Sequence, residues 1–512
     1  MQLSGLLKRL SPTREQLWYS IPFFFIIQKC FRENLPLLDF WWHLKMGQVI
    51  LENGAIPRTD IFSFTAAGKV FVVQNWLAET ILYAVYALGG EKILLLFNTA
   101  VFFAVIFILW RISRSLSHST WASVFATMVV AVCLPVNIRP QIFSFLLFAL
   151  FYWILSSWDA GGFKRIYWLP ILVVAWVNLH GAFVLGLGLM AIFLAVEAIH
   201  LRVTTVAGEY ADRRRIVHLG AAFMLSLVAT LANPEGYGIY RYIGTVVNDA
   251  SSRLFVSEWQ PPHIMELTGI LLFFFPFFLT AITLILSEKQ PRMIDLILFT
   301  GFALFGLTAM RNCAWFQLIA TPILARHLPS IPWKSMLVCW GSDLKRNSLF
   351  SLSPGSGNVQ RINLAVAGLL VFLVLVKSPL WRNLQGEGLL DSQTPVGAAD
   401  YIEEHNLKGN TFHPQIYGDY LLWRLWPQQR VFFDGRVHLY GEEFVRAYFR
   451  IYEDSDWEDR LKKSKIRYVL LEKPQESDEG KGLVGRIGRS RNWKKIFEDS
   501  RSILWERLTP ID

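Results

Sequence analysis

Long apolar runs separated by short polar loops make up the first three quarters of the chain. The runs are long enough, or nearly long enough, to cross a bilayer as helices. They lie at residues 16–33, 91–111, 118–137, 140–157, 166–178, 181–201, 216–232, 266–286, 294–310, 312–328 and 362–378. This pattern predicts an all-α polytopic membrane bundle of about eleven transmembrane helices.

The pattern changes after about residue 378, where charged and turn residues separate much shorter apolar stretches. "RVFFDGR", "IRYVLLE" and "SILWERL" have the composition of strands, whereas "PVGAADYIEEH" and "EEFVRAYFRIYE" have helical spacing. We therefore predict two domains, a transmembrane domain at residues 1–378 and a small soluble α/β domain at residues 379–512.

Lysine and arginine in the short loops predict the orientation of the bundle, because these residues concentrate on the cytoplasmic side. With a cytoplasmic N-terminus, every inner loop is basic: Lys8, Arg9 and Arg14; Arg111 and Arg114; Lys164 and Arg165; Arg202 and Arg213 to Arg215; Lys289 and Arg292; Lys334, Lys345, Arg346 and Arg361. No small-x-small cleavage site follows the first apolar run, which favours an uncleaved first helix. The alternation places the first large loop, residues 34–90, and the C-terminal domain outside the cytoplasm.

Composition agrees with a membrane protein, since 53% of the residues are hydrophobic and only 18% are charged. The net charge of +10 resides mostly in the loops that set topology, so we assign no nucleic-acid partner. The four cysteines have neither disulfide-framework nor metal-site spacing.

Polar clusters that do not suit a lipid-facing helix all fall on the predicted outer side. They are "DFWWHLK", "PRTD", "QNWLAE", "NIRPQ", "NLHG", "NPEGYG", "SEW" and "MRN". A transporter is expected to carry polar groups near the middle of the membrane, along broken helices. A one-sided ring of acids, bases and amides beneath a soluble domain is instead typical of a catalytic mouth.

Structural interpretations of the same residues remain open. Asp39 could cap an amphipathic helix at about residues 40–52, with Phe40, Trp41 and other apolar side chains facing lipid. The tryptophans could belong to an interfacial aromatic belt. A lone histidine such as His180 is often a hydrogen-bonded core residue, and "FFDGR" reads as a strand followed by a tight turn.

The first loop resembles the first periplasmic loop of GT-C glycosyltransferases, and is most similar to the branch of aminoarabinose transferases and protein O-mannosyltransferases. In this resemblance Asp39 matches the leading acid, Gly54 the glycine, and Pro57 with Arg58 the Pro-Arg turn. Two departures are clear: Phe40 stands where that branch has glutamate, and "QNWLAE" replaces its Lys-Pro-Pro stretch.

A wider set of stretches resembles a group of bacterial membrane proteins regarded as GT-C-like, and it covers nearly the whole chain. These stretches are "DFWWHLKMG", "PRTDIFSF", "NIRPQIFSF", "NLHG", "EW", "YGDYLLWRLWP" and "FFDGR". The resemblance implies a GT-C-like bundle, a polyprenyl-phosphate sugar donor, and a lipid or glycan acceptor. It implies no required cofactor, although a divalent metal is not excluded. Such a likeness predicts the fold of a chain more firmly than it predicts the reaction that the chain catalyses.

Sugar transfer from a lipid phosphate requires a base for the acceptor hydroxyl and cationic groups for the departing phosphate. By its match to the family acid, Asp39 is the candidate base, with Asp60 as a second catalytic acid. The candidate substrate-binding residues are His43, Lys45, Arg58, Glu79, Arg139, His180, Glu258 and Arg311. Asp434 and Arg436 are candidates to cover the acceptor.

Together these observations predict a glycosyltransferase of the bacterial inner membrane that uses a polyprenyl-phosphate-linked sugar outside the cytoplasm. Two other functions remain open at this point. One is a non-catalytic transporter or assembly factor for envelope polysaccharide, and the other is a glycan ligase or polymerase.

Overall fold

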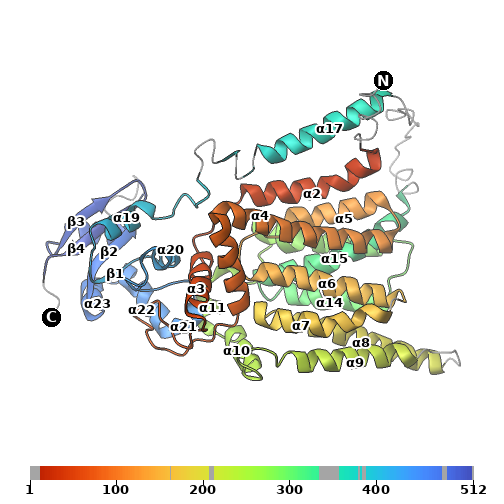
Figure 1. Ribbon diagram of the computed structural model, residues 1–512, viewed down its shortest axis with the longest axis horizontal. Coiled ribbons are helices and arrows are strands. Elements are labelled where there is room, and N and C mark those ends of the chain that lie inside the picture. The colour runs from red at the N-terminus through yellow and green to blue at the C-terminus, as the bar shows by residue number, and fades with distance from the viewer. Residues whose placement is uncertain are drawn as a thin grey trace.

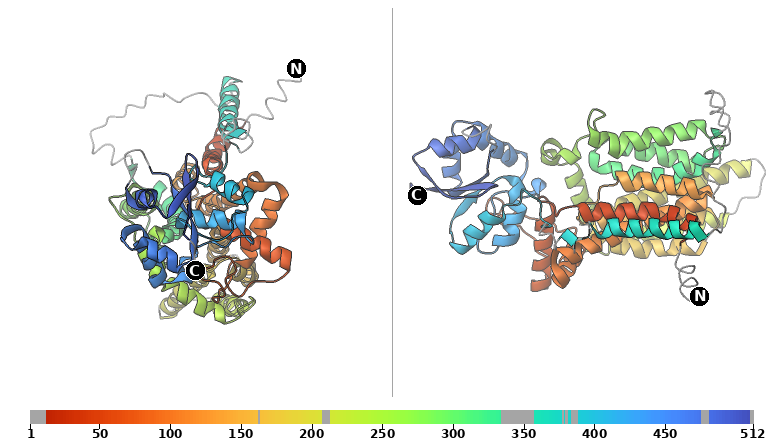
Figure 2. Two further views of the ribbon diagram at one scale, coloured as in Figure 1. Left: turned by 90° about the vertical axis from the view of Figure 1, so that its left-hand side faces the viewer. Right: turned by 90° about the horizontal axis from the view of Figure 1, so that it is seen from above.

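A computed structural model describes residues 12–161, 163–206, 213–333, 357–376, 378, 381–382, 388–474 and 481–509. Lys8, Arg9 and the basic residues Lys334, Lys345 and Arg346 lie outside the described residues. Figure 1 shows a bundle of long helices side by side and a smaller mixed part at one end of it. The same division is visible from above in Figure 2.

A helix lies over each of the eleven apolar runs. The helices are α2 (Arg14–Arg32), α4 (Trp76–Ser117), α5 (Thr120–Cys133), α6 (Gln141–Asp159), α7 (Trp168–Leu179), α8 (Phe183–Val206), α9 (Arg213–Ala229), α12 and α13 (Leu267–Gly269 and Phe275–Leu286), α14 (Met293–Gly306), α15 (Cys313–His327) and α17 (Gly357–Leu375). The long helix α4 contains a kink at Gly89 and Gly90. It contacts α2, α5, α6, α7 and α15, and so occupies the centre of the bundle.

Four of these helical segments are long and apolar enough to cross a membrane, among the described residues: Trp76–Ser117, Gln141–Asp159, Phe183–Val203 and Leu267–Leu286. Four shorter helices are also apolar: Thr120–Cys133, Arg165–Leu179, Met293–Gly306 and Ile362–Leu375. A membrane-embedded helical bundle is therefore supported, whereas the number of eleven crossings stays a prediction.

One end of the bundle is built from shorter elements. Helix α3 (Phe40–Asn53) lies across the ends of the long helices, and α10 (Gly238–Val247) and α11 (Ala250–Phe255) lie at the same end (Figure 1). The predicted amphipathic helix is thus present, but it does not face lipid. Phe40, Trp41 and Leu44 are buried, because α3 packs between α4 on one side and α20 (Gln415–Leu425) on the other.

The C-terminal part is a four-stranded sheet with helices around it, in agreement with the predicted α/β class. The strands are β1 (Asn410–Phe412), β2 (Ile466–Glu472), β3 (Trp493–Glu498) and β4 (Ser502–Arg507), in the order β1-β2-β4-β3. β1 pairs with β2 in parallel, and the other pairs are antiparallel. The helices are α19 (Val396–Glu404), α20, α21 (Val437–Tyr440), α22 (Glu442–Glu453), α23 (Trp457–Lys463) and α24 (Gly482–Arg489).

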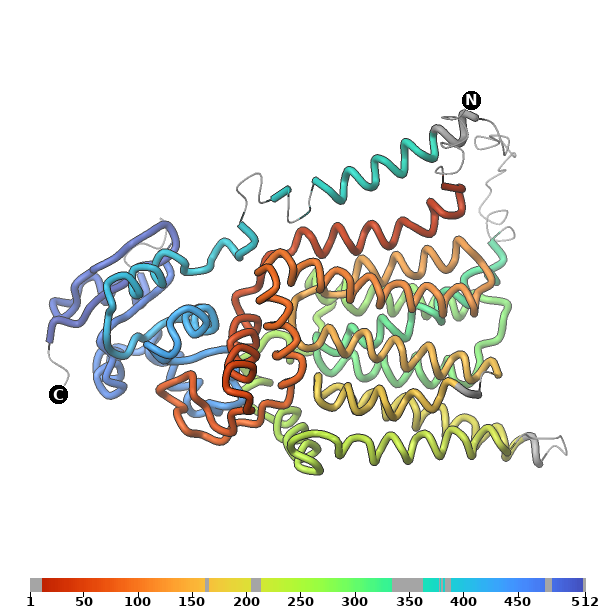
Figure 3. Tube along the Cα trace, in the orientation of Figure 1, coloured from red at the N-terminus to blue at the C-terminus, as the bar shows by residue number. Residues whose placement is uncertain are grey.

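The strand prediction for "RVFFDGR" was wrong. Residue Val431 forms only an isolated bridge, and its partner is Ser63 of the first loop. Backbone hydrogen bonds run from Phe64 N to Val431 O (3.1 Å) and from Val431 N to Phe62 O (3.0 Å). The first loop therefore takes the place of a neighbouring strand, and Figure 3 shows it running between α3 and the C-terminal part.

Candidate active site

The centre of the candidate site is Asp39, at the start of α3. Its backbone is in the left-handed region (φ 65°), and its side chain makes no capping hydrogen bond to the helix. Residues other than glycine adopt this conformation uncommonly, although Asp and Asn tolerate it better than most. Asp39 is therefore at the cap position without acting as a cap, and its carboxylate is free for other contacts.

Those contacts come from loops at the same end of the bundle. Arg139, in the loop before α6, places Nη1 3.4 Å from Asp39 Oδ2 and 2.7 Å from Glu258 Oε2. Glu258 belongs to the short 3-10 turn at Ser257–Trp259, and the guanidinium of Arg311 lies 4.5 Å above the ring of Trp259. The predicted site residues Arg139, Glu258 and Arg311 thus lie in one cluster with Asp39, although they come from widely separated parts of the chain.

The two acids of this cluster have opposite pKa shifts. Enclosure raises the pKa of Asp39; Arg139 opposes the rise, and the charge of Glu258 adds to it. Burial also acts to raise the pKa of Glu258, but Arg139 and Arg311 together lower it. A pair of carboxyls whose environments push their pKa values apart is a common basis for separate acid and base roles.

His180 is held as a neutral imidazole next to this cluster. Burial, assisted by the charge of Arg311, lowers its pKa to about 3. Its Nδ1 accepts from the backbone N–H of Ala182 (3.2 Å) and lies 2.9 Å from Ser144 Oγ, which itself accepts from Trp176 Nε1. Because Nδ1 is an acceptor, the ring hydrogen is on Nε2, which leaves that atom as a hydrogen-bond donor.

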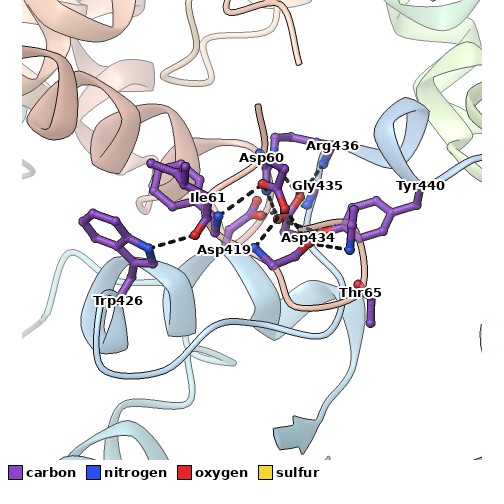
Figure 4. Close-up of polar contacts among 12 residues, drawn as sticks. Asp60, Ile61, Thr65, Asp419, Trp426, Asp434, Gly435, Arg436 and Tyr440 are labelled. Carbon is purple, nitrogen blue, oxygen red and sulfur yellow. Dashed lines mark hydrogen bonds and ion pairs between the residues drawn. The ribbon is translucent and has the colours of Figure 1, made fainter. Parts of the chain in front are cut away.

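The C-terminal part anchors the backbone of Asp39, which sequence reasoning did not foresee. Asp419 of α20 accepts from Asp39 N at 2.5 Å through Oδ2 and from Gly435 N at 2.8 Å through Oδ1. Figure 4 shows Asp419 beside Gly435 and close to the first loop. Burial raises the pKa of Asp419 well above its usual range, and the carboxylates of Asp434 and Asp39 raise it further.

Gly435 leaves the space that the carboxylates of Asp39 and Asp419 occupy, so a side chain at this position would displace them. A Cβ atom on Gly435 would lie 2.6 Å from Asp39 Oδ1 and 2.9 Å from Asp419 Oδ2. The only sequence signals for these two residues were the stretches "YGDYLLWRLWP" and "FFDGR", which the resemblance to GT-C-like proteins had already singled out.

Asp60 lies apart from Asp39, in a buried ion-pair network. Arg436 Nη2 is 2.7 Å from Asp60 Oδ1 and 2.6 Å from Asp434 Oδ2, and all three side chains are fully buried. Asp60 also accepts hydrogen bonds from its own loop, including the hydroxyl of Ser63 at 2.6 Å, and Tyr440 donates to Asp434 (Figure 4). This network, the Asp60–Arg436–Asp434 triad, joins the first loop to the C-terminal part.

The other predicted residues form three separate contacts. His43 Nδ1 lies 2.7 Å from Glu79 Oε1 in a buried pair between α3 and α4, and burial lowers the pKa of His43 well below its usual range. Lys45 lies 4.9 Å above the ring of Trp423. Arg58 forms an ion pair with Glu235 on the surface.

The described residues contain no group of three or more histidine, cysteine, aspartate or glutamate side chains placed to hold a metal ion. The groups near Asp39 are instead the carboxylate of Glu258, the guanidinium groups of Arg139 and Arg311, and the neutral imidazole of His180.

The whole-chain structure resembles solved membrane glycosyltransferases. The oligosaccharyltransferase of Archaeoglobus fulgidus superimposes with a TM-score of 0.53 at 12% sequence identity, over 89% of this chain and 69% of that one. This likeness shows that the chain shares the fold of that protein. ArnT of Cupriavidus metallidurans, solved with bound undecaprenyl phosphate, also matches (TM-score 0.48, 13% identity, 96% of this chain and 97% of that one). No protein-family model and no curated protein sequence matches the chain.

The shared fold agrees with the resemblance that the first loop bears to GT-C glycosyltransferases. It also agrees with the apolar helices of the bundle, which indicate a membrane-embedded protein.

Proposed function

We propose that this protein is a GT-C-type glycosyltransferase that moves a sugar from a polyprenyl-phosphate donor to an extracytoplasmic lipid or glycan acceptor. The observation that carries the proposal is the cluster of Asp39, Arg139, Glu258, Arg311 and His180 at one end of an apolar bundle. We further propose that the protein lies in the bacterial inner membrane, with the N-terminus in the cytoplasm and the C-terminal domain outside.

In this mechanism Asp39 is the general base. It accepts the proton of the acceptor hydroxyl, while the acceptor oxygen forms the bond to the anomeric carbon of the sugar. The bond from that carbon to the phosphate oxygen breaks, and its electron pair leaves with the phosphate. Because phosphate is already a weak base, the leaving group needs no second carboxylic acid. The raised pKa of Asp39 makes it a stronger base than an ordinary aspartate.

The cations of the cluster would stabilise the charge that develops on the leaving phosphate. Guanidinium groups bind phosphate oxygens through two parallel N–H donors, and Arg139 and Arg311 are the candidates here. The ring N–H of His180 is a neutral donor that adds no charge. Glu258 holds Arg139 through the 2.7 Å ion pair, and so fixes the guanidinium next to Asp39.

The separate contacts suggest supporting roles for the remaining residues. We assign the triad residue Asp60 to holding the first loop, because its oxygens are occupied by Arg436 and by loop donors. We assign His43 and Glu79 to the wall behind Asp39, and Lys45 and Arg58 to the contacts that hold α3 and the loop rim.

The positions of the other ion pairs favour an enzyme over a transporter. Arg292 pairs with Asp159 and Asp295, and all three residues lie at or near the ends of helices. A polysaccharide transporter is expected to have ionisable side chains midway along its helices.

Asp39→Asn tests the role of the base. Asparagine tolerates the left-handed backbone and keeps the shape of the side chain, so the protein should fold while the transfer rate falls by at least about 10²-fold. The measurement is consumption of polyprenyl-phosphate hexoses and pentoses in membranes, which carry the native acceptors, followed by mass spectrometry.

The matched control is Glu52→Gln, which removes an exposed carboxylate from the same helix α3 and should leave the rate unchanged. Full activity of Asp39→Asn would refute the assignment of the base. Failure of the wild-type protein to consume or co-purify with any polyprenyl-phosphate lipid would refute the function itself.

A further inference from the structure

A cavity of about 510 Å³ lies where several strands of the C-terminal sheet begin or end, far from the Asp39 cluster. The beginnings of β1 and β2 and the end of β4 meet there, because β1 and β2 are parallel and β4 runs antiparallel to β2. Four of the residues that line it are cationic: Lys408, Lys465, Arg467 and Arg507. We call this cavity the basic pocket.

Arg507 lines the basic pocket, and one of its buried N–H groups lacks a hydrogen-bond acceptor. The residue is only 8% exposed; its Nε donates to Ile466 O at 3.2 Å, and its guanidinium lies 4.6 Å above the ring of Trp493. Its Nη2 is buried without a hydrogen-bond partner among the described residues. A buried guanidinium N–H that lacks an acceptor is unfavourable, so an incoming oxyanion would satisfy it.

The rim of the basic pocket adds positive charge that is only partly compensated. Arg467 is paired with Glu506 at 2.9 Å, and its Nη1 donates to Lys408 O. Within the described parts of the chain, neither Lys408 nor Lys465 has a carboxylate within ion-pair distance. Glu506 beside Arg467 and Glu458 near Arg507 are the opposing carboxylates. The four cations outnumber these two acids, so the pocket is electrostatically suited to an anion.

The backbone of Lys465 is also unusual. It has a φ of 53°, in the left-handed region, where residues other than glycine are strained. The turn that presents this lysine to the pocket is thus held at some cost in stability, and glycine would fit the same turn better.

The position of the basic pocket argues against membrane lipid as its ligand. β4 ends at the pocket, and this end of β4 lies on the side of the C-terminal part away from the helical bundle in Figure 1 and in the right-hand view of Figure 2. The volume of about 510 Å³ suits a small polar ligand or a short segment of a polymer.

From these observations we infer that the basic pocket binds the phosphate or carboxylate groups of an anionic glycan; the anionic groups follow from the lining of the pocket, and the glycan rests on the proposed function. This is an equilibrium binding site that is independent of the chemistry at Asp39, so it goes beyond the proposed glycosyl transfer. It would hold an acidic polymer against the C-terminal part, outside the bundle.

The test uses the full chain in nanodiscs of neutral phosphatidylcholine. Glucose 6-phosphate and digalacturonic acid are the probes, maltose is the neutral comparison, and binding is measured by calorimetry. Both acidic saccharides should bind and maltose should not. Lys465→Gly should weaken binding about tenfold, since one charge-assisted contact is lost, while thermal stability is kept or raised. Arg507→Gln should weaken binding more.

Arg450→Gln is the matched control, because it removes an exposed cation from α22, away from the basic pocket, and should leave binding unchanged. Equal affinity of wild type and Lys465→Gly would overturn the proposal, as would binding of maltose as tight as that of the acids. Tighter binding of a single-stranded oligonucleotide or of phosphatidylglycerol vesicles would overturn the glycan assignment.

Discussion

Arg436→Met should strongly destabilise the contact between the first loop and the C-terminal part. The Arg436 side chain is fully buried, and it is the charge partner of both Asp60 (2.7 Å) and Asp434 (2.6 Å). Methionine keeps much of the side-chain volume against the rings of Phe62 and Phe71, so the change is mainly one of charge. Two carboxylates would remain buried with neutral donors only.

Breaking a buried ion pair by removing one partner costs about 3–5 kcal/mol. Asp60→Asn should cost less, because the pair between Arg436 and Asp434 survives. The loss is still at least about 1.5–3 kcal/mol, since the new NH2 group faces a backbone N–H that the carboxylate had accepted. Replacing all three triad residues by neutral ones should recover much of the loss, since no lone charge is left in the interior.

The assay is thermal unfolding in detergent at one scan rate, together with hydrogen exchange of residues 60–71 and 431–440. At about 2–4 °C per kcal/mol, Arg436→Met should lower the unfolding temperature by roughly 6 °C or more. The control is Arg446→Met, which removes the exposed pair with Glu442 on α22 and should cost less than about 1 kcal/mol. The reasoning is refuted if Arg436→Met and Arg446→Met unfold alike, or if the triple replacement is the least stable variant.

Two further predictions concern the Asp39 cluster. Gly435→Ala would place a methyl group 2.6 Å from Asp39 Oδ1, about 0.8 Å inside ordinary contact, so the carboxylate must move. The rate of sugar transfer should then fall on the order of 10²-fold although the charge of Asp39 is unchanged. Gly244→Ala is the control, because the added atom meets open space there. The rate should also fall at low pH as Asp39 becomes protonated. Glu258→Gln removes a negative neighbour, lowers the pKa of Asp39 and should shift this fall to lower pH, whereas Arg139→Gln should shift it to higher pH; shifts in the same direction would contradict the assigned electrostatics.

Most of the fold could be predicted from the spacing of apolar residues and from the positions of the charged residues. Each apolar run corresponds to a helix, and "IRYVLLE" and "SILWERL" correspond to β2 and β4. The runs could not show that α3 is buried, because its tryptophans look the same whether they face lipid or protein. Trp41 in fact packs against Tyr420 and Trp423 of α20, a segment almost four hundred residues away in sequence.

Prediction of the site was limited because several of its contacts join segments that lie far apart in the sequence. The resemblance to the GT-C first loop identified Asp39, whereas residue type and topology identified Arg139, Glu258 and Arg311, since charges at the ends of apolar helices need partners. Nothing in the sequence could reveal that Asp60 is saturated by Arg436, or that Asp419 anchors the backbone of Asp39, because both depend on contacts between the first loop and the C-terminal part.

The hydrogen bond from Asp39 to Asp419 also has a consequence for biosynthesis. The two residues are 380 positions apart, and Gly435, which lies against the same carboxylate, is farther still. Chains are made from the N-terminus, and domains generally fold as they emerge. A nascent chain can therefore insert its whole helical bundle while the acid of its first loop has no backbone anchor. The candidate site is completed only when the last quarter of the polypeptide has left the ribosome, so a prematurely terminated chain would have a helical bundle with an unfinished site.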